Sequence, residues 1–241
     1  MAQAKIRLHV DHPLGAGQSV PLTEAQAHYL FGVMRQSAGS HVLVFNGQNG
    51  EWLAEVTEAG KRKGTLTCLE QSGPQVMPPD LWLLFAPVKK ARTDFIVEKA
   101  VELGAARIIP VQTDFTNSER IRQDRLQAHA LEAAEQCGAT FVPEVHGLIA
   151  LPRLLADWDA NRKILWADEN LVGAATTLAS ASPGPWAILI GPEGGFSDTE
   201  RARLRSMPPV VPVSLGPRIL RADTAAVAAI TLWQAALGDW R

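Results

Sequence analysis

Two loops of this sequence combine glycine, proline and charged side chains in a way that could bind a ligand. In the first, Gly191 to Gly195, three glycines in five residues permit positive φ and let a ligand approach bare backbone. The second, Gly216 to Arg221, holds two arginines and two large apolar residues, and Asp223 follows it. Carboxylates and arginines of this kind can accept a proton and stabilise developing negative charge. We therefore expect a site here; two tight turns in an α/β domain are the alternative.

The spacing of these loops excludes two common nucleotide sites. Neither loop contains G-x-x-x-x-G-K-[ST], so a nucleoside triphosphate site is not expected. Neither has the G-x-G-x-x-G spacing of a dinucleotide-binding fold.

The elements around the loops place them at one edge of a sheet. Trp186–Ile190 and Val210–Leu215 are apolar runs bounded by Gly and Pro, which fit buried strands of a parallel sheet. Ser197 with Glu200 predicts a capping box for a helix that starts near Asp198. Two successive strand–loop–helix units put both loops at the carboxyl ends of neighbouring strands, where open α/β sheets bind ligands.

The preceding segment reads as a βαβ unit. The pattern predicts a strand at Leu81–Ala86, a basic loop, a helix capped by Thr93 that ends at Gly104, and a strand at Arg107–Val111.

The remaining elements complete the α/β pattern. We expect helices at Arg125–Cys137 and Leu151–Trp158, a strand at Lys163–Glu169 and a loop over residues 174–185. Cys137 is expected in the core. Asp168 and Glu169 could form a second acidic site, but a solvated strand end is the favoured interpretation. Asp223 or Thr224 is expected to cap the last helix, which ends at Gly238.

Residues 1–72 predict a small β-rich domain. A hairpin is expected around Asn46-Gly47 and Asn49-Gly50, and Gly64–Leu69 alternates like a further strand. Leu22–Val33 reads as a helix with Thr23 as its N-cap. The Pro-rich stretch Gln71–Asp80 marks a stiff joint and the domain boundary.

Composition narrows the possible partners. The chain has 241 residues and a net charge of −2, so a nucleic-acid surface must be a local patch. No apolar run approaches the roughly 20 residues that span a bilayer, and the first residues lack the apolar core of a signal peptide; we expect no membrane association and a cytoplasmic protein. The two cysteines stand far apart with no metal-binding spacing, so we expect no metal.

The loop motifs resemble those of a known family. I-G-P-E-G-G-F-S, followed by S-L-G-P-R-I-L-R-A-D-T-A, resembles the SPOUT superfamily of knotted methyltransferases, and within it the bacterial 16S ribosomal RNA (uracil-N3)-methyltransferases. The resemblance covers nearly the whole chain. It implies an α/β fold class, with a PUA-like β-barrel RNA-binding domain over residues 1–72 and a C-terminal SPOUT trefoil-knot methyltransferase domain over residues 73–241. It also implies S-adenosyl-L-methionine as cofactor, 16S rRNA within the small ribosomal subunit as partner, and a homodimer.

The resemblance carries a set of cofactor-binding residues onto this chain. They are Leu165, Gly191, Pro192, Glu193, Gly194, Leu215, Gly216, Arg218, Ile219, Leu220 and Thr224.

Methylation of uracil N3 requires groups that remove a proton and stabilise charge on the uracil oxygens. The base must also be held out of any stack. A carboxylate and an arginine suit these tasks. We assign Arg221 to the developing oxyanion, with Arg218 as a further catalytic candidate, and either Glu193 or Asp223 to proton acceptance. Hydrogen bonding within the loop and helix capping are the alternatives for Glu193 and Asp223.

Four basic residues are candidate RNA contacts. They are Arg7, Arg35, Lys89 and Arg92, the last two because K-x-x-R resembles the family's pattern before a helix that ends E-L-G. The run Lys61–Lys63 is favoured as a solvated turn.

The chain also departs from the family pattern. The family commonly has an Arg in the loop that holds Phe115, often an Arg where Ala139 stands, and frequently a Glu at Asp223. These differences keep two alternatives open: a non-catalytic RNA-binding or ribosome-assembly protein, and a methyltransferase for another RNA base.

Overall fold

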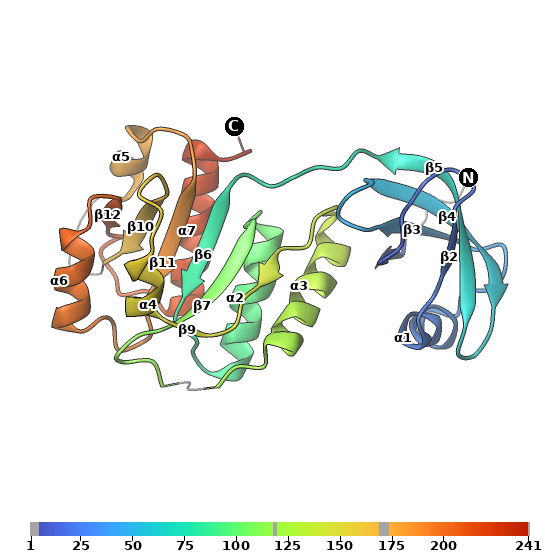
Figure 1. Cartoon of the computed structure of the whole chain (residues 1–241), viewed down its shortest axis with the longest axis horizontal. Coiled ribbons are helices and arrows are strands. Elements are labelled where there is room, and N and C mark those ends of the chain that lie inside the picture. Colours follow the sequence, from blue (N-terminus) through green and yellow to red (C-terminus); the bar gives the residue numbers. More distant parts are fainter. Residues whose placement is uncertain (1–4, 118–119, 169–173, 241) are drawn as a thin grey trace. The chain divides into compact units, whose positions relative to one another are not determined.

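The chain divides into two compact units (Figure 1). The computed structural model describes residues 5–117, 120–168 and 174–240, with the side chains of 174–176 excepted. The first unit comprises Met1–Met77 and Ala134–Val142; the second comprises Pro78–Ala133 and Pro143–Arg241. The predicted boundary after residue 72 stays a prediction.

A five-stranded sheet forms the first unit, in the order β1-β3-β4-β5-β2. The strands are β1 (Arg7–His9), β2 (Ser19–Pro21), β3 (His41–Phe45), β4 (Glu51–Ala59) and β5 (Gly64–Gly73). β1 pairs with β3 in parallel and the other neighbours are antiparallel. The predicted hairpin between β3 and β4 is confirmed, and Gly47 and Gly50 adopt φ values of 78° and 75°, which favour glycine.

The predicted helix of the first unit is confirmed, in two parts. α1 (Glu24–Ala27) continues into η1 (His28–Val33), a π-helical segment. Thr23 is the N-cap, and Gln26 completes a capping box with it. Leu30 is fully buried in the core cluster of this unit. Residues 61–63 are exposed at the turn between β4 and β5, as predicted.

The second unit is built on a sheet in the order β12-β10-β11-β6-β7-β8, with β9 paired to β7. Its strands are β6 (Leu81–Phe85), β7 (Arg107–Gln112), β8 (Glu144–Val145), β9 (Ile149–Ala150), β10 (Lys163–Ala167), β11 (Trp186–Ile190) and β12 (Val210–Val213). Their pairings are all parallel. Every residue of β11 is buried, as the continuous apolar run predicted.

The strand order corrects one expectation. β11 and β12 are not neighbours, because β10 lies between them and pairs with both. The carboxyl ends of three strands therefore meet where the sequence predicted two.

Helices cover this sheet (Figure 1). They are α2 (Lys90–Glu102), α4 (Leu151–Ala156), α5 (Ala174–Ala179), α6 (Asp198–Ser206) and α7 (Ala222–Leu237). Leu151 and Leu155 of α4 and Leu204 of α6 share a core cluster with residues of β6, β7, β10 and β11. α7 contacts α2, α5 and β11. α3 (Gln123–Cys137) has residues in both units.

Of the three helix-capping predictions in the second unit, one is confirmed and two are wrong. Ser197 and Glu200 form the predicted box at the start of α6. Thr93 does not cap α2: the N-cap is Lys89, and the buried Thr93 hydroxyl bonds back to Val88. Neither Asp223 nor Thr224 is the N-cap of α7, since both lie in its first turn and Arg221 occupies that position without a side-chain cap.

Two further predictions were wrong. Residues 174–179 form α5 instead of a loop, because Leu178 is buried and α5 packs on α7. Cys137 is exposed, so it is not a core residue. Within the described ranges no helix is long and apolar enough to cross a membrane.

Candidate functional site

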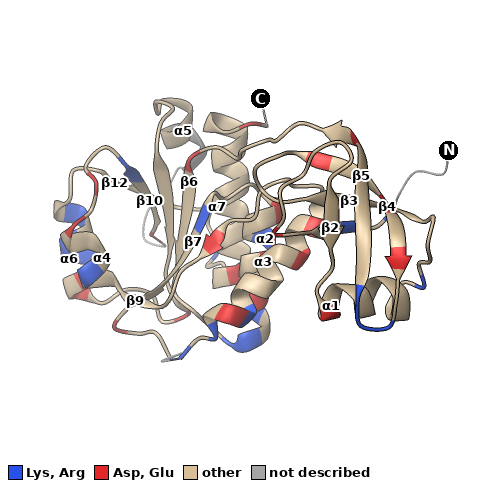
Figure 2. Ribbon diagram, turned by 45° about the vertical axis from the view of Figure 1, so that its right-hand side comes forward, with Lys and Arg blue, Asp and Glu red and all other residues tan. Residues whose placement is uncertain are grey.

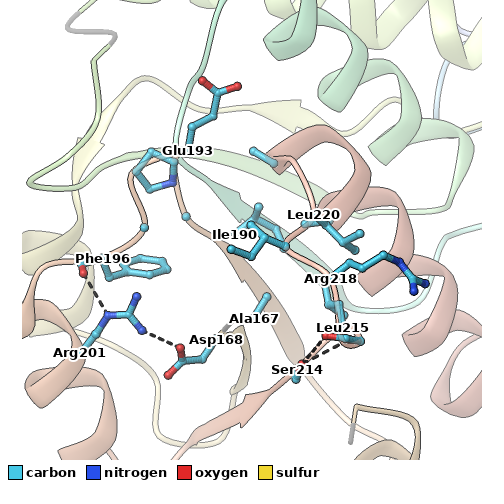
Figure 3. A pocket seen from close by; sticks show the side chains of 17 residues that line it. Ala167, Asp168, Ile190, Glu193, Phe196, Arg201, Ser214, Leu215, Arg218 and Leu220 are labelled. Carbon is cyan, nitrogen blue, oxygen red and sulfur yellow. Dashed lines mark hydrogen bonds and ion pairs between the residues drawn. The ribbon is translucent and has the colours of Figure 1, made fainter. Parts of the chain in front are cut away.

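A cavity of the second unit opens where β10, β11 and β12 end (Figure 3). Each strand contributes the residues that follow or close it. The lining residues are Ala167, Asp168, Ile190, Gly191, Pro192, Glu193, Gly195, Phe196, Arg201, Ser214, Leu215, Gly216, Arg218, Ile219, Leu220, Ala222 and Ala225. Both loops predicted from the sequence thus line one cavity.

The first loop lies close to an aromatic ring. Phe196 is 6% exposed and meets Trp166 edge to face, with ring centroids 5.8 Å apart. A Cβ added to Gly191 would lie 2.6 Å from this ring, so only glycine fits there without a shift. Gly195 adopts a φ of 71°, another position that favours glycine. Glycine thus lets the Phe196 ring pack directly against the backbone at the end of β11.

The second loop is held by Ser214, which lies two residues before it. The Ser214 hydroxyl donates to the Gly216 carbonyl at 3.1 Å and accepts from the Gly216 amide at 3.3 Å. Gly216 has a φ of 127°. Ile219 is 84% exposed although it is large and apolar. The loop therefore presents both backbone and apolar surface to the cavity.

A buried ion pair closes one side of the cavity. Asp168, at the end of β10, has a side chain that is 0% exposed, and Arg201 of α6 donates to it at 2.6 Å. Arg201 also donates to the Phe196 carbonyl at 3.1 Å (Figure 3). Arg205 reaches the same carboxylate at 3.3 Å. This pair ties α6 and the glycine loop to β10.

The sequence interpretation missed this pair. Asp168 was expected at a solvated strand end and is buried instead; Glu169 lies outside the described residues. The position of Asp168 directly after an apolar strand was the available signal, because such positions line ligand sites in parallel sheets.

The cavity gathers eight of the predicted cofactor residues. These are Gly191, Pro192, Glu193, Leu215, Gly216, Arg218, Ile219 and Leu220. Leu165, Gly194 and Thr224 are not among the lining residues: Leu165 is buried within β10, and Thr224 is exposed in the first turn of α7. Their roles stay predictions.

Arg92 of α2 lies between the two candidate proton acceptors. It donates to the Glu193 carboxylate, and its Nε lies 3.8 Å from a carboxylate oxygen of Asp223. The side chain of Glu193 is 49% exposed and that of Asp223 is 21% exposed. Both carboxylates are therefore held near one guanidinium. Arg221 is exposed at the N-cap of α7.

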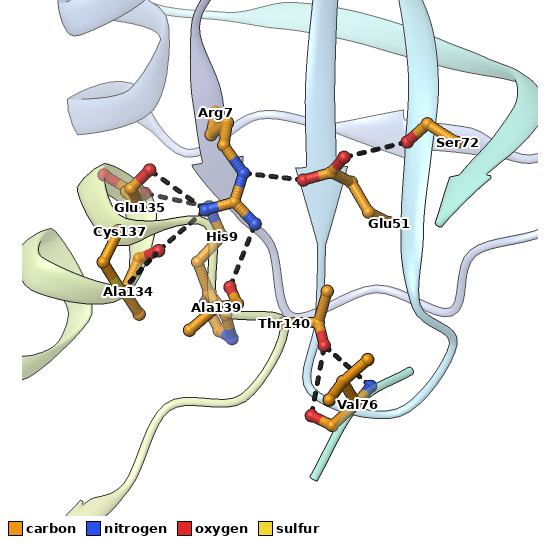
Figure 4. Close-up of polar contacts among 10 residues, drawn as sticks. All are labelled: Arg7, His9, Glu51, Ser72, Val76, Ala134, Glu135, Cys137, Ala139 and Thr140. Atoms are coloured by element: carbon orange, nitrogen blue, oxygen red, sulfur yellow. Dashed lines mark hydrogen bonds and ion pairs between the residues drawn. The ribbon is translucent and has the colours of Figure 1, made fainter. Parts of the chain in front are cut away.

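Arg7, a predicted RNA contact, forms several hydrogen bonds within the first unit (Figure 4). Its guanidinium donates to Glu51 at 2.6 Å and to the carbonyls of Ala134, Glu135 and Ala139 at 2.7 to 3.0 Å. The side chain is 12% exposed. Arg7 thus has a structural role at the C-terminal end of α3, and its RNA contact stays a prediction.

The other predicted RNA contacts are placed differently. Arg35 is exposed, with a φ of 54° that is uncommon outside glycine. Lys89 is exposed at the N-cap of α2.

The residues that differ from the family pattern, and their neighbours, form local contacts. Phe115 packs against Gly194, since a Cβ there would lie 3.2 Å from the Phe115 Cβ. Asp114 accepts from the Ser197 hydroxyl, and its amide donates to Glu200. Ala139 supplies one of the carbonyls bound by Arg7.

Comparisons with known proteins agree with this architecture. The RNA methyltransferase domain family matches residues 76–234, and the RNA methyltransferase PUA domain family matches residues 22–67. Ribosomal RNA small subunit methyltransferase E of Rickettsia conorii is 29% identical over 93% of both chains. The protein of the same name from Synechocystis is 32% identical, covering 88% of this chain and 71% of that one.

A solved structure shares the fold. The crystal structure of a ribosomal RNA small subunit methyltransferase E from Neisseria gonorrhoeae, bound to S-adenosyl methionine, superposes with a TM-score of 0.88 and 27% identity, covering 98% of this chain and 99% of that chain. The predicted fold class, a PUA-like domain with a SPOUT methyltransferase domain, is confirmed.

Proposed function

Because the chain belongs to the ribosomal RNA small subunit methyltransferase E family, we infer that it is an S-adenosylmethionine-dependent methyltransferase of 16S ribosomal RNA. We propose N3 of one uridine as the methyl acceptor. The observation that carries the proposal is the cavity at the ends of β10, β11 and β12, into which both glycine-containing loops converge.

The residues of the cavity fit this cofactor. Gly216 has open space where a side chain would lie and leaves backbone free for an adenosyl group. Ile190, Leu215 and Leu220 offer apolar surface to its adenine. When bound, the cofactor supplies an electrophilic methyl group. The protein then has to align the acceptor more than it has to make bonds.

Proton acceptance is the task of a carboxylate near the cavity. Uracil N3 carries a proton that must leave before or during attack, and Glu193 and Asp223 are the carboxylates beside Arg92. Their shared ion pair with Arg92 supports a common role in orienting the base. Arg218 and Arg221 would stabilise the negative charge that spreads onto the uracil oxygens.

The test is a methyl-transfer assay on small ribosomal subunits that lack their modifications. Purified protein and labelled S-adenosylmethionine are added, and the digested RNA is analysed by mass spectrometry. We expect N3-methyluridine at one position. Transfer to another base would overturn the proposed acceptor, and no transfer to any RNA would favour the non-catalytic alternative.

Two isosteric variants identify which carboxylate is the general base. Glu193→Gln and Asp223→Asn each remove one carboxylate with little change in shape. The variant that lacks the general base should lose the rise of kcat/KM with pH, whereas the other variant should keep this rise. A pH profile unchanged in both variants would exclude both residues.

The dimer and the cytoplasmic location are also proposals. Trp233 is 2% exposed and packs within this chain, whereas Trp240 is 50% exposed and available to a partner. Sedimentation at micromolar concentration should show a dimer; a monomer would contradict a site built from two chains.

A further inference from the structure

Three hollows of the second unit form a series that begins at the cofactor cavity. The first adjoins the glycine loop at Pro192 and Glu193 and is also lined by Lys89, Lys90 and Asn117. Because Pro192 and Glu193 line the cofactor cavity as well, the two spaces share a wall.

The series continues through residues that adjacent hollows share. The second hollow shares Val88 and Lys90 with the first and adds Arg120, Arg122 and Arg125. The third shares residues 120–122 with the second and ends at Gly147 and Leu148. We call the three hollows together the basic groove.

Only some cations of the basic groove form ion pairs. Arg125 forms a bidentate ion pair with Asp94, and Arg122 pairs with Asp124. Lys89, Lys90 and Arg120 have no carboxylate partner among the described residues. In a chain with a net charge of −2, three cations without a carboxylate partner in one groove favour the binding of anions there.

Two helix N-termini reinforce this charge. Lys89 and Lys90 begin α2, and Arg122 directly precedes α3, so both helices start at the groove. The free amides and the dipole of each N-terminus favour negative charge. Figure 2 shows Lys and Arg gathered around the start of α3.

We propose that the basic groove binds consecutive phosphates of the single-stranded RNA that flanks the methylated uridine. The proposal rests on the proposed function, because the groove leads away from Glu193 at the mouth of the cofactor cavity. A base that is held out of its stack has unpaired neighbours, and a series of hollows suits a chain of phosphates better than one small anion. Lys90 and Arg120, which the sequence interpretation did not single out, are the central contacts.

Salt-dependent RNA binding tests the groove. A fluorescent oligouridylate is titrated by anisotropy at several salt concentrations with the full chain and with Lys90→Ala/Arg120→Ala. Each phosphate contact to a single strand contributes about 0.7 to the slope of log K against log salt, so losing two should reduce the slope by about 1.4.

A control variant outside the groove tests whether the loss of an exposed cation elsewhere changes the slope. Arg153→Ala removes an exposed cation of α4, outside the groove, and should leave the slope unchanged. Calorimetric titration with S-adenosylmethionine should give the same affinity for all three proteins. Lys90→Gln/Arg120→Gln repeats the test with longer side chains in case the alanine variant folds poorly.

The outcomes distinguish the two proposals. If the double variants keep the slope of Arg153→Ala while the full chain methylates RNA, the groove is overturned and the proposed function stands. If the slope falls but the full chain transfers no methyl group, the groove stands and the proposed function fails. If the full chain does not bind RNA, the proposed role of the groove in binding phosphates is overturned.

Discussion

Arg7 in the first unit and Arg120 in the second are both cations in a weakly acidic chain, yet their surroundings differ. Arg7 is 12% exposed, and its donors are bound by Glu51 and by three carbonyls at the end of α3. Arg120 is exposed and lines two adjoining hollows. A basic residue near a predicted RNA surface is therefore informative only once its partners are known.

The two units also differ in which property a substitution should reduce. In the first unit an arginine closes a helix end, where the helix dipole favours positive charge. In the second unit exposed cations surround a cavity and a groove. Substitutions should therefore reduce stability in the first unit and activity in the second.

The largest effect is expected for Arg221→Ala. Loss of a group that stabilises the developing oxyanion should reduce kcat about 100- to 1000-fold. Because the side chain is exposed, the free energy of unfolding should change by less than about 0.5 kcal/mol. Steady-state kinetics and urea unfolding measure the two quantities. Unchanged turnover would remove Arg221 from the mechanism.

Arg7→Ala should show the reverse pattern. The substitution leaves Glu51 and three carbonyls without their donor in a largely buried setting, at a cost of about 3 kcal/mol in the free energy of unfolding. Affinity for S-adenosylmethionine should not change. Arg35→Ala, at an exposed position, is the control and should cost less than about 0.5 kcal/mol. If both variants were equally stable, the structural role of Arg7 would be wrong.

Gly191→Ala should weaken cofactor binding without unfolding the chain. The new Cβ would meet the Phe196 ring at 2.6 Å, and overpacking of this kind costs about 1 to 3 kcal/mol of folding stability. Because Gly191 and Phe196 both line the cavity, the shift that relieves the clash also changes the cofactor site. We expect at least about a fivefold loss of affinity by calorimetry. Gly15→Ala, in the first unit and with open space around its Cα, should bind normally. Equal affinity in the two variants would separate Gly191 from the cofactor site.

The smallest expected effect concerns His9. Burial lowers the pKa of this imidazole below its ordinary 6.5, and the nearby Asp11 only partly opposes the shift. The neutral form is thus favoured in the native state, so its contribution to stability is complete above pH 6.5 and is lost as the pH falls through the lowered native pKa. The Tm of His9→Gln should fall less between pH 7.5 and 5.5 than that of the native chain. His41→Gln, at an exposed site, should behave like the native chain.

Several elements followed from local pattern alone. The Asn-Gly hairpin, the capping boxes at Thr23 and Ser197, and the apolar strand Trp186–Ile190 all depend on contacts within a few residues. The two site loops were visible for the same reason, because runs of Gly, Pro and charge between apolar segments are a local signal. Other local signals failed where tertiary contacts competed: Thr93 bonds back to Val88, and α5 exists because Leu178 is buried.

The sequence by itself determined which residues supply bare backbone, carboxylates and arginines, and it placed them after apolar strands. Only the tertiary structure inserted β10 between β11 and β12, which brought Asp168 and Arg201 to the cavity. It also set Arg92 between Glu193 and Asp223, and bound Arg7 to carbonyls more than 120 positions away. The physical reason is that strand order and long-range ion pairs depend on contacts between distant segments, and the period and spacing of one segment carry no information about them.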